Sequence, residues 1–75
     1  MTIQAVYRVQ VGAYVVRDYA NRLLNKLQNE GFPAYLVYEN GMYKVQVGTY
    51  EDIDNAVKME RRLRGEGYNT FITSR

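Results

Sequence analysis

The sequence has 75 residues, which is enough for one small domain and too few for two hydrophobic cores. Ten Lys and Arg against eight Asp and Glu leave a net charge of +2, which does not favour a protein that binds mainly by neutralising a polyanion. The absence of Cys and His excludes disulfides, Cys nucleophiles, His general bases and the usual zinc sites. We therefore expect no metal and no cofactor.

The first half of the chain predicts a strand, a helix and a second strand. Val9 and Val11 alternate with polar residues, which is the two-residue period of a half-buried strand. Apolar residues then recur at the spacing of a helical stripe, namely Val16, Ala20, Leu23, Leu24 and Leu27. Gly31 ends this helix and Pro33 prevents its continuation, so the second strand is expected at residues 34–38.

The second half of the chain repeats the first at an offset of 36 residues. The sequence YRVQVGAY at 7–14 recurs as YKVQVGTY at 43–50, and the alignment continues without a gap. The repeat units are 7–39 and 43–75, within a domain of residues 6–75 that follows an N-terminal extension or artificial start at 1–5. The last strand is expected at residues 70–74.

The two helices are expected to begin differently. Glu51, Asp52 and Asp54 place negative charge at the start of the second helix, where the helix dipole favours it. The equivalent Val15 and Val16 offer no side-chain oxygen, so the first helix should lack an N-cap.

Two β-α-β units predict an α+β fold of order βαββαβ, the ferredoxin-like split βαβ arrangement, with a four-stranded antiparallel sheet and both helices on one face. A chain this short has no third layer for the other face, which we call the open face. Asn40-Gly41 predicts a two-residue type I′ turn, which sets the register of the hairpin. That register and the repeat place nine residues on the open face, which we expect to be flat: Arg8, Gln10, Tyr35, Val37, Met42, Lys44, Gln46, Phe71 and Thr73.

Catalysis fits these residues poorly. Of the eight carboxylates, Glu51, Asp52 and Asp54 lie at the start of a helix, and Glu30 and Glu66 precede helix-ending glycines, where structural roles are common. Acylphosphatases share the fold and bind phosphate through a loop after the first strand that ends in Arg. Here Arg17 has Ile53 as its repeat equivalent, whereas Gly12 recurs as Gly48, so a turn explains the glycine better. We expect no enzymatic activity in this domain.

RNA-recognition domains also share the fold, and they read single strands with aromatic residues on the two central strands. None of the outward residues expected on the central strands is aromatic: Arg8, Gln10, Met42, Lys44 and Gln46. Nucleic-acid binding is therefore not expected, although an RNA-binding module that uses the open face is the alternative. A protein-interaction domain that uses the free sheet edges is a third possibility.

The duplicated Val-Gln-Val-Gly-(Ala/Thr)-Tyr, the Ala-x-x-(Leu/Met)-x-x-x-Leu helix and the Glu-Gly-aromatic helix end resemble the SPOR domain, the sporulation-related repeat of bacterial cell-wall proteins. The resemblance spans residues 7–74. It implies a non-catalytic module that binds peptidoglycan glycan strands lacking stem peptides, and that brings a cell-wall amidase or a division or sporulation protein to the septum or spore-associated wall. It also implies that the glycan lies on the open face. The chain departs from the family pattern at Ala13, Val15, Val16 and Met42.

Eight residues are therefore expected to bind glycan: Arg8, Gln10, Tyr35, Val37, Met42, Lys44, Gln46 and Phe71. The apolar side chains suit the faces of sugar rings, and the amides suit hydroxyl and acetamide groups. Arg8 and Lys44 suit the lactyl carboxylates that glycan without stem peptides exposes. We expect the domain to belong to a larger extracytoplasmic protein of the bacterial cell wall or envelope, such as an N-acetylmuramoyl-L-alanine amidase. No apolar run has the ~20 residues of a membrane span, and the sequence leaves the oligomeric state open.

Overall fold

The computed structural model describes residues 5–74, so the expected N-terminal extension lies outside the described residues except for Ala5, as does Arg75. The elements are β1 (Tyr7–Tyr14), α1 (Arg17–Asn29), β2 (Ala34–Glu39), β3 (Met42–Tyr50), α2 (Ile53–Gly65) and β4 (Phe71–Ser74). This order confirms the predicted βαββαβ fold. Asn40 and Gly41 have φ angles of 53° and 76°, and both positive values are what a type I′ turn requires.

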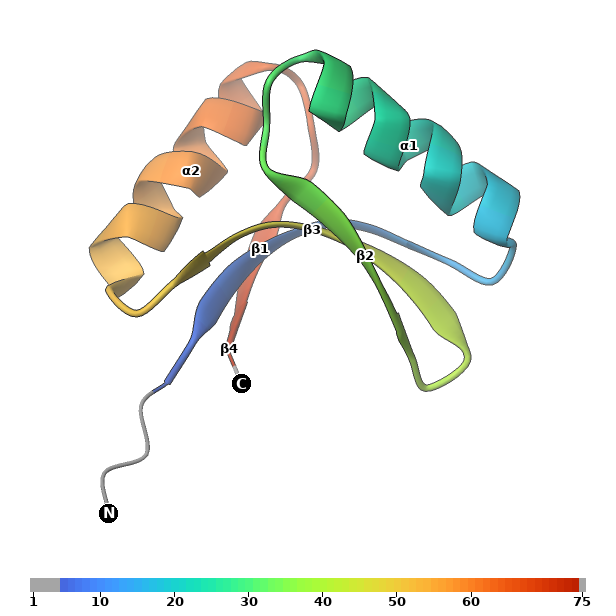
Figure 1. Cartoon of the computed structure of the whole chain (residues 1–75). Coiled ribbons are helices and arrows are strands. Elements are labelled where there is room, and N and C mark those ends of the chain that lie inside the picture. The colour runs from blue at the N-terminus through green and yellow to red at the C-terminus, as the bar shows by residue number, and fades with distance from the viewer. Residues whose placement is uncertain (1–4, 75) are drawn as a thin grey trace.

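The sheet has the strand order β2-β3-β1-β4, with antiparallel neighbours throughout. Figure 1 shows it bent into an arch, with α1 and α2 on the convex side and the open face inside the bend. The register between β1 and β3 shifts between Tyr7 and Val9 and again between Gln10 and Gly12. Bulges of this kind bend a strand and increase its twist. The expectation of a flat open face was therefore wrong.

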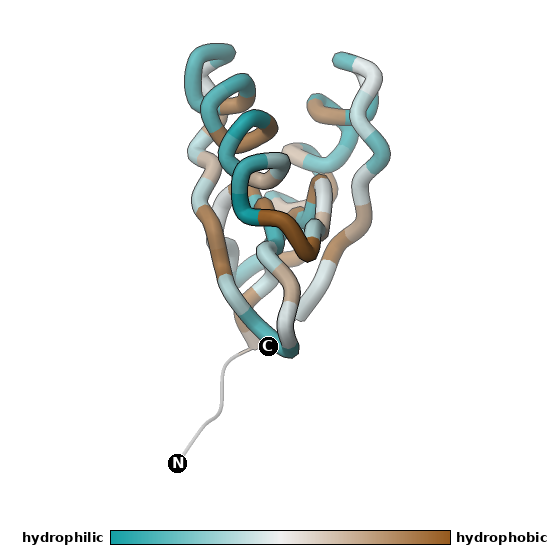
Figure 2. Tube along the Cα trace, turned by 90° about the vertical axis from the view of Figure 1, so that its right-hand side faces the viewer, coloured by the Kyte–Doolittle hydropathy of each residue, from teal (hydrophilic) through white to brown (hydrophobic). Residues whose placement is uncertain are grey.

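The core lies between the sheet and the two helices. Val9, Val45 and Val47 of the central strands are fully buried against Leu27 of α1 and Leu63 of α2. Figure 2 shows that hydrophobic residues recur along both helices between longer hydrophilic stretches, as an amphipathic helix on a sheet requires. Within residues 5–74, neither helix is long and apolar enough to cross a bilayer.

Both helices end in a Schellman motif. At the end of α1, the N–H groups of Phe32 and Gly31 donate to the carbonyls of Leu27 and Gln28, both at 3.0 Å. The equivalent bonds recur after α2, and the glycines that follow the two helices have φ angles of 89° and 95°. The helix starts differ as predicted, because the Asp52 carboxylate accepts from an N–H of α2 at 2.9 Å whereas α1 has no side-chain cap.

Reciprocal contacts join the two repeat units. Lys26 of the first unit lies 5.0 Å from the ring centroid of Tyr68 in the second, and Arg62 of the second lies 5.2 Å from the ring centroid of Phe32 in the first. Tyr68 also donates from its hydroxyl to the Glu30 carboxylate at 2.5 Å. Burial, with the hydrogen bond to Glu30, raises the pKa of Tyr68 to about 12. The two units therefore pack as one body.

Candidate functional site

One row of side chains crosses all four strands in the middle of the open face. Tyr35 of β2 pairs with Gln46 of β3, Gln46 pairs with Gln10 of β1, and Gln10 pairs with Phe71 of β4. Directly paired residues point to the same face of a sheet. We call these four residues the central row. Its order of aromatic, amide, amide and aromatic is symmetric, because both amides and both aromatics are equivalent at the 36-residue offset.

The two glutamines of the central row are bonded to each other and buried. The Gln46 Nε2 atom donates to the Gln10 Oε1 atom at 3.2 Å, and the two residues are 2% and 8% exposed. The sequence identified the correct face for both glutamines but did not predict that their side chains are buried. The Gln46 Oε1 atom has no hydrogen-bond partner within the described residues. A buried polar atom in this state typically costs about 1–3 kcal/mol, so the centre of the open face is left unsatisfied.

The two cations of the open face, Arg8 and Lys44, lie on opposite sides of the central row. Arg8 pairs with Thr73, and Lys44 pairs with Val37 and Ala13. Lys44 donates from Nζ to a Glu39 carboxylate oxygen at 2.8 Å, which completes an ion pair. Glu39 was not among the predicted site residues, although it lies two residues beyond Val37 on the same face.

Arg8 differs sharply from Lys44. It is only 8% exposed, its Nε atom is buried without a partner, and its side chain forms no ion pair with any residue from 5 to 74. Buried cations in proteins are normally paired with an anion or a set of acceptors. Among residues 5–74, the open face therefore holds one cation with a carboxylate partner, Lys44, and one without, Arg8.

The aromatic residues of the central row also differ. The Tyr35 hydroxyl donates to the Gly48 carbonyl at 3.0 Å and lies 3.3 Å from the Thr49 hydroxyl. Gly48 and Thr49 form the bulge of β3, opposite Arg8, so Tyr35 is bonded to this bulge. Phe71 has no hydroxyl and is 57% exposed on the edge strand. Phe71 is thus the freely accessible aromatic surface, while Tyr35 also holds the bulge in place. The sequence analysis missed this second role of Tyr35 and the position of Thr49.

All eight predicted site residues lie on the open face, because register and contacts place them there. The half-buried ones are Tyr35, Val37, Met42 and Lys44. Met42 pairs with Glu39 at the hairpin end of the sheet and is therefore farthest from Arg8. The central row and the two cations are adjacent in the register of the sheet, on the inner side of its arch.

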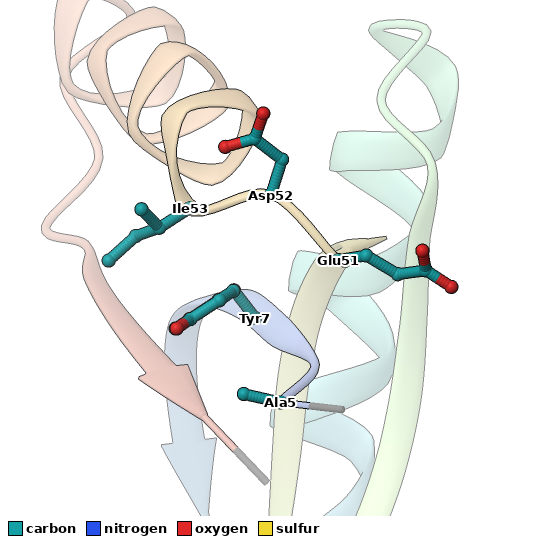
Figure 3. Close-up of a pocket in the computed structure, with 5 residues that line it drawn as sticks. All are labelled: Ala5, Tyr7, Glu51, Asp52 and Ile53. Atoms are coloured by element: carbon teal, nitrogen blue, oxygen red, sulfur yellow. The ribbon is translucent and has the colours of Figure 1, made fainter. Parts of the chain in front are cut away.

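A separate depression of about 550 Å³ lies where β1 approaches the start of α2, and it is lined by Ala5, Tyr7, Glu51, Asp52 and Ile53. The carboxylates of Glu51 and Asp52 point in different directions in Figure 3, and the Glu51 group points away from Tyr7. Among residues 5–74, no group of acidic residues could hold a metal ion. This depression shares no residue with the open face.

The SPOR domain family matches residues 4–74, which is nearly the whole chain. The chain belongs to the SPOR family. This SPOR domain has the same fold as the solution structure of the peptidoglycan binding domain of the B. subtilis cell wall lytic enzyme CwlC. That similarity has a TM-score of 0.88 and 28% identity, and it covers 100% of this chain and 95% of the CwlC domain.

The Spor protein DedD shares the fold as well, with a TM-score of 0.73 and 20% identity over 92% of this chain and 38% of DedD. The comparison with curated proteins gives no match.

Proposed function

We propose that this SPOR domain binds peptidoglycan through the open face. The observation that carries the proposal is the central row, in which two buried amides lie between two aromatic residues on a face that no other helix or strand of residues 5–74 covers. The similarity to a peptidoglycan binding domain over the full length of the chain supports the same conclusion. The domain is a binding module and not an enzyme.

The chemistry of the open face matches that of a glycan strand. A pyranose ring has an apolar face that packs well on an aromatic side chain, and Phe71 supplies such a surface beside Gln10. Hydroxyl and acetamide groups around the ring both donate and accept hydrogen bonds. The unpartnered Gln46 Oε1 atom is an acceptor that an N–H or O–H group of the sugar would satisfy after a small side-chain rotation.

Glycan strands without stem peptides are the preferred ligand in this proposal. Removal of the stem peptide exposes a lactyl carboxylate on each muramyl residue, whereas an intact stem peptide converts that carboxylate to an amide. A free carboxylate forms charge-assisted hydrogen bonds with a cation of the open face. The curved face also leaves less room for peptide branches than a flat face would. Attached to a cell-wall amidase or to a division or sporulation protein, the domain would bring its partner to denuded septal or spore-associated wall.

Cosedimentation with cell-wall sacculi before and after amidase digestion tests the proposal. The wild-type domain should bind digested sacculi more tightly than undigested ones. A failure to bind digested sacculi contradicts the proposal, and tight, salt-sensitive binding to single-stranded RNA instead would favour the RNA-binding alternative.

The variant that tests the central row in the same assay is the double variant Gln10→Ala/Gln46→Ala. The double change is preferable to Gln10→Ala alone, because the single change leaves the buried Gln46 amide without its partner. The double variant should lose about tenfold or more in sacculus affinity, since each lost hydrogen bond is worth roughly 0.5–1.5 kcal/mol. Asn25→Ala, at an exposed position on α1, is the control and should bind like the wild type.

A further inference from the structure

We propose that Arg8, and not its repeat equivalent Lys44, holds the carboxylate of the bound glycan, so that an acidic amino sugar occupies the β1–β4 half of the open face. This inference rests on the proposed glycan binding and adds the position of the acidic sugar to it. The internal duplication alone would suggest two equivalent cation sites, one in each half.

The two halves of the open face are related by the repeat. Arg8 and Lys44 are equivalent at the 36-residue offset, and they lie on opposite sides of the central row. A surface with this internal symmetry would accept the acidic sugar in either half if both halves carried the same chemistry. The position of that sugar must therefore depend on the features in which the two halves differ.

Charge compensation is the main difference. Glu39 accepts from Lys44 at 2.8 Å, so an anionic ligand group near Lys44 would meet a carboxylate already in place. No carboxylate of residues 5–74 forms an ion pair with Arg8, which is more than nine-tenths buried and has an unpartnered Nε–H. A guanidinium whose Nε–H lacks an acceptor within residues 5–74 is well suited to a planar carboxylate, because a guanidinium can bind a carboxylate through two parallel hydrogen bonds.

The neighbours of Arg8 fit an acidic sugar. Thr73 lies beside it on β4 and can donate or accept through its hydroxyl. Exposed Phe71 lies in the adjacent central row on the same strand, where it can contact the ring of the sugar that carries the carboxylate. The half of the face around Lys44 offers Val37 and Ala13 instead, and these suit a neutral sugar.

Isothermal titration calorimetry with three oligosaccharides of equal length tests the proposal. The first is the alternating glycan from amidase-digested peptidoglycan, the second is the same glycan with its carboxylates converted to methylamides, and the third is a chitin oligosaccharide. The wild-type domain should bind the carboxylate form about tenfold to a hundredfold more tightly than the methylamide form, as expected for a hydrogen-bonded charge.

Two variants complete the test. Arg8→Gln should remove this preference while its residual affinity for the methylamide form stays near that of the wild type, and Arg8→Lys should restore part of the preference. Lys44→Gln should keep the preference. An equal loss in Arg8→Gln and Lys44→Gln, or a preference that survives Arg8→Gln, overturns the assignment to Arg8. A wild-type domain that binds none of the three ligands overturns the proposed function itself.

Discussion

Replacement of Gly48 by Ala should destabilise the domain more than replacement of any glycine at a helix end. Gly48 lies at the bulge of β3 with a φ angle of 72°, and its N–H donates to the Pro33 carbonyl at 3.0 Å. A non-glycine residue in this left-handed conformation costs about 1–2 kcal/mol. A Cβ atom at this position would also overlap the ring of Tyr50, which packs against the core.

The size of the effect follows from these two contributions. Overpacking in a well-packed region typically adds about 1–3 kcal/mol, so Gly48→Ala should cost roughly 2–5 kcal/mol in total. A domain of this length is typically stable by only about 4–11 kcal/mol. Gly31→Ala is the matched control, because Gly31 has a φ angle of 89° but no atom within 4 Å of the added Cβ. It should cost only the backbone contribution of about 1–2 kcal/mol.

Urea unfolding followed by tyrosine fluorescence or circular dichroism measures both variants, and the difference between them reports the overlap with Tyr50. In the double variant Gly48→Ala/Tyr50→Leu, the two costs should be less than additive, because removal of the ring relieves the overlap. An equal cost for Gly48→Ala and Gly31→Ala would refute the reasoning, since it would mean that the ring moves aside freely. Gly48→Ala should also weaken sacculus binding, because the Gly48 carbonyl holds the Tyr35 hydroxyl.

Three further predictions concern single contacts. Phe71→Ala should reduce sacculus binding with little change in the unfolding midpoint, because the ring is largely exposed. Tyr35→Phe should lower the unfolding free energy by about 0.5–1.5 kcal/mol, because the hydrogen bond of its hydroxyl is lost. The reverse pattern would contradict the roles given to these two residues. Val16→Asp should supply the missing N-cap of α1, as Asp52 does for α2, and raise the unfolding free energy by about 0.5–2 kcal/mol; an unchanged thermal midpoint would speak against it. Hydrogen bonds from Arg64 and Thr70 lower the pKa of the Glu60 carboxyl below its ordinary value. Glu60 therefore stabilises the fold above the ordinary glutamate pKa, and this contribution is lost as the pH falls through the lowered value. Unfolding measured between pH 7 and pH 3 should show a smaller loss of stability for Glu60→Gln than for the wild type, and parallel curves would contradict this.

The sequence by itself determined the elements, the duplication and the register of the β2–β3 hairpin, but not the register shifts between β1 and β3. These features depend on local chemistry that a short stretch of chain already contains. Val9 and Val11 carry the strand period, Gly31 supplies the left-handed helix end, and Asn40-Gly41 forces the tight hairpin turn. Once the turn set the parity of β3, the repeat extended the same parity to the other strands, and all eight predicted residues lie on the open face.

Only the tertiary structure decided how those residues are used. Gln10, Gln46 and Arg8 are buried on the inner side of an arched sheet, which the sequence did not predict. Lys44 pairs with Glu39, whereas Arg8 has no such partner among residues 5–74. This difference depends on the path of neighbouring strands, because Arg8 and Lys44 are equivalent in the repeat. The alternation of polar and apolar residues in the sequence predicts to which face of the sheet a side chain points. Burial and charge compensation depend on what the rest of the chain places around it, and for this domain they separate two halves that the sequence makes nearly alike.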